Sequence, residues 1–298
     1  EGTAISDLEN PDRVLIGGDD EKAISLLTRI YLNWVPDHKI IKTNLWSSEL
    51  SKLTSNAFLA QRISSINSIS ALCEETGADI NQVKNAVGMD TRIGHEFLKA
   101  GPGFGGSCFE KDILNLVYLC GFYKLDAVAN YWQGVVDINN WQKSRISKLI
   151  VDYLFGNVSG KKITILGFAF KANTNDTRQS PSIQICRDLL LEGAEISIYD
   201  PKVEEDKIET DLKFISCQVD AKWSRKESIE EASKDSDAIV VLTDWKEFYS
   251  INWDFIYTIM RKPAWVFDTR SCINYEKAKK AGFNLWKLGK AMENNSEF

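Results

Sequence analysis

The sequence predicts an α/β protein in three successive parts. Over residues 155–298, short apolar strands alternate with helical stretches, which is the pattern of a doubly wound parallel sheet. Over residues 45–154 the strand patterns are missing, and apolar residues recur at helical spacing instead. Residues 1–44 hold a single strand–helix–strand unit, so we interpret them as the C-terminal remnant of another parallel α/β domain.

The elements of the first two parts follow from their apolar spacing. The remnant is predicted to contain strands at 14–18 and 39–43 around a helix at 19–34. The central part is predicted to be all α, with helices at 46–76, 81–88, 113–120 and 126–153. Small residues on one face of the longest helix allow close helix–helix contact, which we expect to involve a second subunit. These small residues are Ser64, Ser65, Ser68 and Ser70.

The last part carries apolar strands at 162–167, 195–201, 238–242 and 264–268, and a helix at 183–192. Gly167–Lys171 follows the first strand but lacks the G-x-G-x-x-G spacing that cradles a dinucleotide pyrophosphate. The pattern therefore predicts a Rossmann-like domain that binds something else. Lys171 and Arg178 in its first loop suit a nucleotide diphosphate.

Composition and charge exclude several classes of protein. The net charge of −6 is spread along the chain, so a nucleic acid is not an expected partner. No window approaches eighteen uninterrupted apolar residues, which argues against a membrane span. The six cysteines include no C-x-x-C pair, which predicts reduced thiols in a cytoplasmic protein. The two histidines are His38 and His95, so no histidine-rich metal site is expected, and His95 is interpreted as a surface residue.

The most informative stretch is the glycine-rich run 103–108, which leads into helical spacing from residue 109. It places Cys108 in or next to the first turn of a helix, where backbone N–H groups and the helix dipole stabilise a thiolate. Asp112 lies one turn further on the same face. Cys108 is therefore a candidate covalent nucleophile. The alternative is a buried, inert cysteine after a flexible loop.

Lys52 and Asn56 are four residues apart and share one face of the long helix. Next to Cys108, an ammonium and an amide would stabilise a developing oxyanion. The alternative is an ordinary solvated helix face. Arg92, which precedes the glycine-rich run, is a candidate anion contact.

Four runs of sequence carry a family resemblance: Trp46–Arg62, Gly103–Phe109, Gly167–Lys171 and Asp176–Arg178. In order and spacing they resemble the UDP-glucose 6-dehydrogenases, of the animal type, in the UDP-glucose/GDP-mannose dehydrogenase family. The resemblance extends over essentially the whole chain. It implies a central helical dimerisation region, which supports a dimer or a hexamer, and a C-terminal Rossmann-like UDP-binding domain. It also implies that most of the NAD-binding domain precedes Glu1, so the isolated chain is expected to be inactive.

The chemistry that the resemblance implies is an NAD-dependent, four-electron oxidation of UDP-glucose to UDP-glucuronate. Cys108 would carry the sugar as a thiohemiacetal and then as a thioester. Lys52 would stabilise oxyanions at the sugar C6. Asn56 and Asp112 would position or activate the water that hydrolyses the thioester.

The resemblance also implies the binding residues. The substrate would be held by Lys99, Gly101, Gly103, Phe104, Gly105, Lys171 and Arg270. Arg92 would reach the sugar site of a neighbouring subunit. On the cofactor side the resemblance points to Glu1, Lys111 and Arg178, and it assigns no residue to a metal.

Two other functions are open on the sequence alone. A related dehydrogenase acting on GDP-mannose or on a UDP-N-acetylhexosamine would keep the same chemistry, although the run Trp46–Arg62 favours UDP-glucose. A non-catalytic module for UDP-sugar binding or for assembly would keep the pocket and the subunit contacts without turnover.

Overall fold

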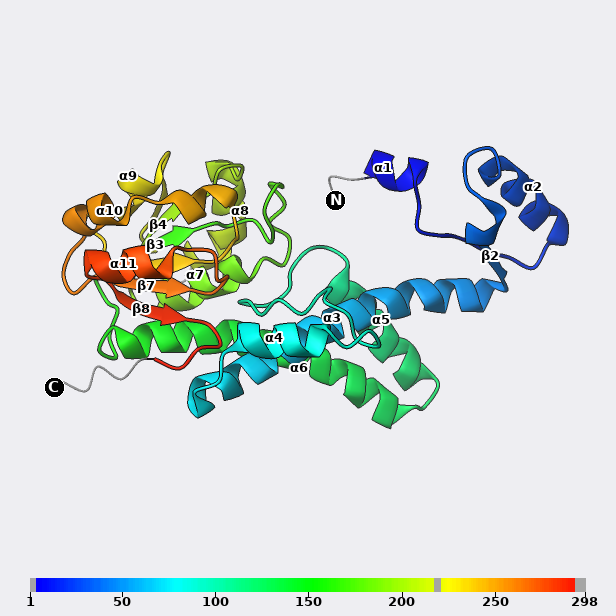
Figure 1. Cartoon of the computed structure of the whole chain (residues 1–298), viewed down its shortest axis with the longest axis horizontal. Helices are drawn as coiled ribbons and strands as arrows, with labels where there is room; N and C mark the ends of the chain where they lie inside the picture. The colour runs from blue at the N-terminus through cyan, green and yellow to red at the C-terminus, as the bar shows by residue number, and fades with distance from the viewer. Residues whose placement is uncertain (1–3, 217–220, 293–298) are drawn as a thin grey trace.

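A helix of 32 residues, α3 (Leu45–Thr76), lies along the length of the molecule (Figure 1). The computed structural model describes residues 4–216 and 221–292, so Glu1, which was expected on the cofactor side, lies outside the described residues. The Asn44 side chain begins α3 by accepting a hydrogen bond from Ser47 N at 2.7 Å. Gly77 ends it with a φ of 76°. The predicted long helix is confirmed.

The N-terminal unit lies at the beginning of α3 (Figure 1). Its two strands pair in parallel, with Val14 opposite Ile40, and one helix connects them. The predicted strand–helix–strand unit is therefore confirmed. Its elements are α1 (Ala4–Glu9), β1 (Val14–Gly17), α2 (Glu21–Tyr31), a 3-10 turn (Asp37–Lys39) and β2 (Ile40–Thr43).

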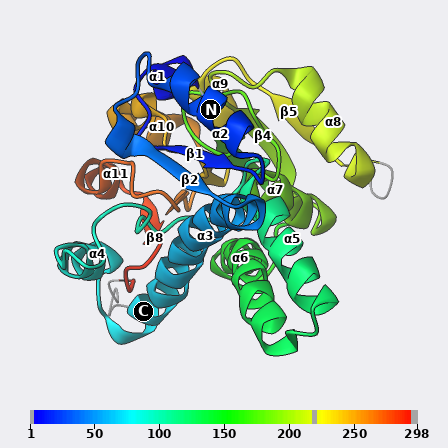
Figure 2. The ribbon, with the colours of Figure 1, turned by 90° about the vertical axis from the view of Figure 1, so that its right-hand side faces the viewer.

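The central part is helical, as predicted. The other central helices are α4 (Ile80–Gly88), α5 (Phe109–Phe122) and α6 (Asp126–Tyr153). Figure 2, viewed from the end that carries β1 and β2, shows α5 and α6 beside α3. Ala57, Ile113 and Val136 are buried where α3, α5 and α6 meet. Ser64 lies in this contact and donates a hydrogen bond to Val135 O at 2.8 Å, so one predicted small-residue contact is made within the chain.

The C-terminal part contains a six-stranded parallel sheet with the order β5-β4-β3-β6-β7-β8. The order reverses between β3 and β6, which is the topology of a doubly wound Rossmann-like domain. The fold class predicted from the sequence is therefore confirmed. The strands are β3 (Lys162–Leu166), β4 (Glu195–Tyr199), β5 (Trp223–Arg225), β6 (Ala238–Val241), β7 (Trp265–Asp268) and β8 (Asn284–Lys287).

Helices cover this sheet, and one of them comes from the central part. Ile146 and Ile150 in the second half of α6 are fully buried in the same core as Ile165 of β3. The domain boundary predicted between residues 154 and 155 therefore lies just after the end of α6, and this helix packs both in the central part and against the sheet. The remaining helices are α7 (Pro181–Leu191), α8 (Glu205–Ser216), α9 (Ile229–Ser233), a 3-10 turn (Lys246–Ser250), α10 (Trp253–Ile259) and α11 (Tyr275–Ala281).

Two strands were missed by the sequence reasoning, and two helices begin two or more residues earlier than predicted. The strands β5 and β8 have three and four residues and lie at the edges of the sheet, so their apolar runs are short. Helix α5 begins at Phe109 rather than at residue 113. Helix α7 begins at Pro181, because Pro is favoured in the first helical turn.

None of the helices in residues 4–216 and 221–292 is long and apolar enough to cross a membrane. The same residues contain no cluster of His, Cys, Asp and Glu that would hold a metal ion. Five cysteines of the described chain are free thiols, and Cys217 lies outside it.

Asp200 fixes the turn after β3. It is completely buried after the end of β4. Its Oδ2 accepts hydrogen bonds from Phe168 N at 2.7 Å and Ala169 N at 3.0 Å, and from the Trp245 indole at 3.2 Å. Its Oδ1 accepts from two further backbone N–H groups. An acidic residue after the second strand commonly binds a nucleotide ribose in Rossmann domains, but here all its capacity is used inside the protein.

We expect Asp200→Ala to lower the free energy of unfolding by about 3–5 kcal/mol, because it leaves several buried donors without an acceptor. Urea unfolding followed by tryptophan fluorescence measures the change. Glu209→Ala, an exposed carboxylate removed from α8, is the control and should change stability by less than about 0.5 kcal/mol. Equal stability of the two variants would contradict the assigned role.

Candidate active site

Three of the four predicted catalytic side chains meet in the structure. Asp112, on the first turn of α5, accepts hydrogen bonds from Lys52 Nζ and from Asn56 Nδ2, the latter at 2.6 Å. Lys52 and Asn56 come from one face of α3, as their spacing predicts. The Asp112 side chain is 7% exposed and that of Lys52 is 60% exposed. Lys52 and Asn56 are therefore not merely part of a solvated face, because both contact a buried carboxylate.

Cys108 is the residue that immediately precedes α5, as predicted. Its thiol is exposed, so the alternative of a buried, inert cysteine is wrong. Its carbonyl accepts the first intrahelical hydrogen bond from Asp112 N at 2.9 Å. The thiol therefore lies at the positive end of a helix, one turn from a carboxylate that carries an ammonium and an amide. A thiol, an ammonium, an amide and a carboxylate are thus grouped together, and these are the side-chain types that nucleophilic catalysis requires.

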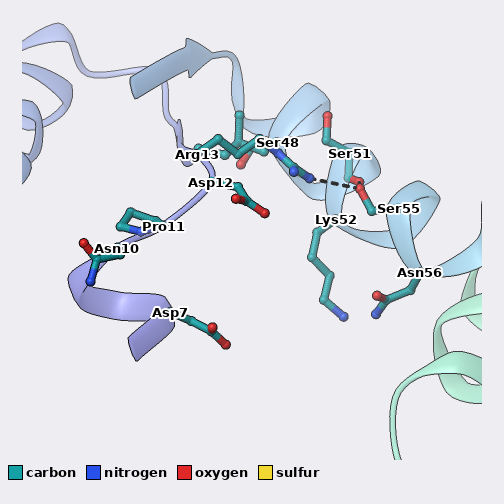
Figure 3. Close-up of a pocket in the computed structure, with 11 residues that line it drawn as sticks. Asp7, Asn10, Pro11, Asp12, Arg13, Ser48, Ser51, Lys52, Ser55 and Asn56 are labelled. Carbon is teal, nitrogen blue, oxygen red and sulfur yellow. Dashed lines mark hydrogen bonds between the residues drawn. The ribbon is translucent and has the colours of Figure 1, made fainter. Parts of the chain in front are cut away.

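An open cavity of about 600 Å³ lies beside this group (Figure 3). Lys52 and Asn56 project toward it from α3, and Asp7 and Asp12 face it from the N-terminal segment. Arg13, from the N-terminal segment, donates a hydrogen bond to Ser55 Oγ of α3 at 3.3 Å and so connects the two sides of the cavity. The sequence reasoning missed Asp7 and Asp12, because within residues 1–44 it assigned only Glu1 to a site and interpreted the rest as a remnant of a sheet.

The glycine loop, residues 101–106, is held by three side-chain amides that are completely buried. Asn67 on α3 accepts from Gly101 N at 2.9 Å, and Gln142 on α6 donates to Gly101 O at 2.9 Å. Asn139 on α6 accepts from Phe104 N at 2.8 Å and donates to Phe104 O at 3.2 Å. These positioning residues were also missed, although buried amides inside two apolar helix faces are a signal that could have found them.

Two positions of this loop require glycine, one because of its backbone angle and one because a Cβ would not fit. Gly103 has a φ of +127°, which side-chain-bearing residues rarely adopt. At Gly105, a Cβ would lie 2.6 Å from Gln179 O and 2.9 Å from Phe170 Cβ. The loop therefore packs directly on the segment after β3, which carries Lys171.

The predicted substrate residues of the two domains also meet. A Cβ built on Gly101 would lie 2.9 Å from the Arg270 guanidinium, so loop and arginine are adjacent. Arg270 Nε donates to Leu242 O at 2.8 Å. Lys99 Nζ lies 2.7 Å from the Asp244 carboxylate. Arg270 and Lys99 both lower the pKa of Asp244, against the effect of its burial. Asp244, which follows β6, is a further residue that the sequence reasoning missed.

The remaining predicted cations are exposed. Lys171 lies over the Phe170 ring, with Nζ 5.6 Å from its centroid. Arg178 pairs with Asp176 at 2.6 Å and lines an open cavity of about 630 Å³. Lys111 is exposed on α5. Arg92 pairs with Asp90 at 2.6 Å, which raises the pKa of Arg92. His95 is exposed, as predicted.

These features define a class of protein. Lys171, Asp244 and Arg270 all follow the carboxyl ends of sheet strands, where doubly wound domains bind their ligands. A glycine loop and a helical region with a thiol complete the site. Residues 46–141 match the central domain of the UDP-glucose/GDP-mannose dehydrogenase family, and residues 164–275 match the UDP-binding domain of the same family. The chain belongs to this family.

Curated relatives and solved structures agree with that assignment. The chain is 51% identical to UDP-glucose 6-dehydrogenase 4 of Arabidopsis thaliana, over 98% of this chain and 65% of the relative. It is 52% identical to UDP-glucose 6-dehydrogenase of Mus musculus, over 97% of this chain and 61% of the relative. It thus spans less than two thirds of either relative, and plant and animal proteins are equally similar.

Among solved structures, a UDP-glucose dehydrogenase from the archaeon Pyrobaculum islandicum superposes with a TM-score of 0.82 at 28% identity. The match covers 98% of this chain and 61% of that chain. A UDP-D-ManNAc dehydrogenase from Pyrococcus horikoshii superposes with a TM-score of 0.80 at 26% identity, over 98% and 63% of the two chains.

We expect Asn139→Leu to loosen the glycine loop, because it leaves the N–H and the C=O of Phe104 unpaired in a buried place. Hydrogen–deuterium exchange of peptides that span residues 101–106 should become faster by about tenfold or more. Asn130→Leu, an exposed site on the same helix, is the matched control and should leave exchange unchanged. Unchanged exchange in Asn139→Leu would contradict the role given to the buried amides.

Proposed function

We propose that this chain supplies the substrate site and the covalent nucleophile of an NAD-dependent UDP-glucose 6-dehydrogenase, which converts UDP-glucose to UDP-glucuronate. The observation that carries the proposal is the contact of Lys52 and Asn56 with Asp112, one turn from the exposed Cys108. The names of the curated relatives support UDP-glucose as the sugar nucleotide.

The chemistry follows from the four side chains. NAD, when bound, would supply the hydride acceptor for both oxidations at C6, and the proton of the C6 hydroxyl would pass to water in the first oxidation. The Cys108 thiolate adds to the C6 carbonyl of the aldehyde, which gives a thiohemiacetal, and loss of the second hydride gives a thioester. The Lys52 ammonium stabilises the C6 oxygen, which becomes negative when the thiolate adds to the aldehyde and again when water adds to the thioester. Asp112 takes a proton from the hydrolytic water, which Asn56 orients, and Cys108 leaves as a thiolate.

The residues of this chain would supply a minor part of the contacts to NAD. Arg178 presents a guanidinium at an open cavity, which suits a pyrophosphate, and Lys111 adds an exposed ammonium. Among the described residues, no strand is followed by a G-x-G-x-x-G turn. We therefore propose that the 298-residue chain alone binds the substrate but does not turn it over.

Self-association through the central helices is also part of the proposal. Large apolar side chains are exposed on α3, α5 and α6, among them Phe58, Tyr118, Phe122 and Tyr131. A second subunit would cover such a surface and would also bring Arg92 toward a neighbouring sugar site. Light scattering should give at least a dimer, and a monomeric mass would contradict this part of the proposal.

Calorimetric titration of the chain with UDP-glucose tests the substrate site. We expect saturable binding of UDP-glucose and much weaker binding of GDP-mannose and of a UDP-N-acetylhexosamine. Lys171→Met should weaken UDP-glucose binding by about tenfold, since an exposed cation that contacts the nucleotide is lost. Lys277→Met, which removes an exposed lysine from α11, is the matched control.

Preference for GDP-mannose or a UDP-N-acetylhexosamine would instead support the related dehydrogenases. Binding of UDP-glucose by the chain, combined with no activity when the whole protein carries Cys108→Ser, would support the enzyme. Full activity of the Cys108→Ser variant would mean that the reaction needs no covalent intermediate, and it would contradict the role of Cys108.

A further inference from the structure

A second polar cavity, of about 490 Å³, lies among α5, α6, α7 and α8. Nine of its ten lining residues are polar or charged, and Ile183 is the apolar exception. The cavity shares no lining residue with the one that Lys52 and Asn56 face. None of the residues assigned above to catalysis, substrate or cofactor lines it.

Lys143 of α6 is the unusual member of this lining, because it is only 5% exposed. Within the described chain, one hydrogen-bond acceptor, Asn140 Oδ1, lies 3.5 Å from its ammonium, and no carboxylate oxygen lies within 4.0 Å. Burial lowers the pKa of Lys143, and the charge of Glu110 partly opposes this effect. A buried ammonium without a counterion destabilises the fold, so its presence points to a ligand that compensates the charge.

Arg187 of α7 adds a second cation with unused donor capacity. One terminal nitrogen donates to Asp211 O at 2.8 Å. Its Nε is buried and has no hydrogen-bond partner among the residues that the structure describes. The carboxylates of Glu110 and Asp211 also line the cavity, but within the described chain neither forms an ion pair with Lys143 or Arg187, and Asp211 accepts a hydrogen bond from Thr177 instead. A water molecule would satisfy the Arg187 N–H group, but it would not supply the charge that the Lys143 ammonium lacks at close range.

We propose that this cavity binds a small phosphate ester that is rich in hydroxyl groups, such as a sugar phosphate. The phosphate would accept hydrogen bonds from Lys143 and Arg187, the two side chains whose charge is least compensated. The Glu110 carboxylate, which makes no side-chain hydrogen bond within the described chain, would accept from the hydroxyl groups. Since the cavity is separate from the nucleotide-sugar site, this inference goes beyond the function proposed above.

The cavity is close to the glycine loop through Lys143. A Cβ built on Gly103 would lie 3.4 Å from Lys143 Cγ, so the stem of this lysine packs behind the loop. Asn139, one turn earlier on α6, holds the next loop residue, Phe104. A ligand bound by Lys143 would therefore fix the side chain that packs against Gly103, whereas Arg270 contacts the loop at Gly101.

Calorimetric titration of the chain with glucose 6-phosphate tests the proposal, with inorganic phosphate and glucose as comparison probes. Lys143→Met and Arg187→Met should each weaken binding by about tenfold or more, because each removes a charged hydrogen bond. Lys148→Met, which removes an exposed lysine from the same helix, is the matched control and should bind like the unchanged chain. Without ligand, Lys143→Met should keep or raise the unfolding temperature, since a buried ammonium is lost.

The proposal is overturned if the unchanged chain shows no saturable binding of glucose 6-phosphate. It is also overturned if both cation variants bind as tightly as Lys148→Met, because the ligand then lies elsewhere on the protein. Equal affinity for inorganic phosphate and glucose 6-phosphate would exclude the sugar contacts and overturn the ester as the ligand. Arg187→Met decides the test if Lys143→Met folds poorly. None of these outcomes depends on whether UDP-glucose binds.

Discussion

The backbone of the glycine loop is the constraint on which the candidate site depends. A glycine-rich segment does not order itself, because each glycine loses much conformational entropy on folding. Here Asn67, Asn139 and Gln142 pair the N–H and C=O groups of two loop residues inside the protein, where unpaired groups would be costly. Phe104, 5% exposed, anchors the same loop in the helical core. The ordered loop therefore fixes the position of Cys108, which follows it closely in the sequence.

The same loop joins the two domains at the carboxyl ends of β3 and β7. At one end it packs against Arg270, which follows β7, and at the other against Phe170, which follows β3. Helix α6 reinforces the joint, because it carries Asn139 beneath the loop and Ile150 in the core of the sheet. The thiol, the loop and the ends of the strands are thus parts of one packed unit rather than features of separate domains.

Much of this could be predicted from the sequence, for identifiable reasons. Helix α6 has the predicted bounds because its apolar spacing is long and uninterrupted. Lys52 and Asn56 share a face because helix geometry brings residues four apart together. Spacing does not reveal that Asp244 pairs with Lys99, since 145 residues separate them. Spacing can also mislead: Gly101–Gly106 matches G-x-G-x-x-G literally, yet the loop follows no strand and has a different environment.

Thiol labelling with and without UDP-glucose tests most directly whether the loop joins the nucleotide-sugar site to the nucleophile. With iodoacetamide and peptide mass spectrometry, Cys108 should react before Cys186 and Cys272, whose pKa values are raised by burial. At ten times its Kd, UDP-glucose should slow the labelling of Cys108 by about tenfold. If UDP-glucose binds but leaves that rate unchanged, the sugar does not reach Cys108, and the account of the site is wrong.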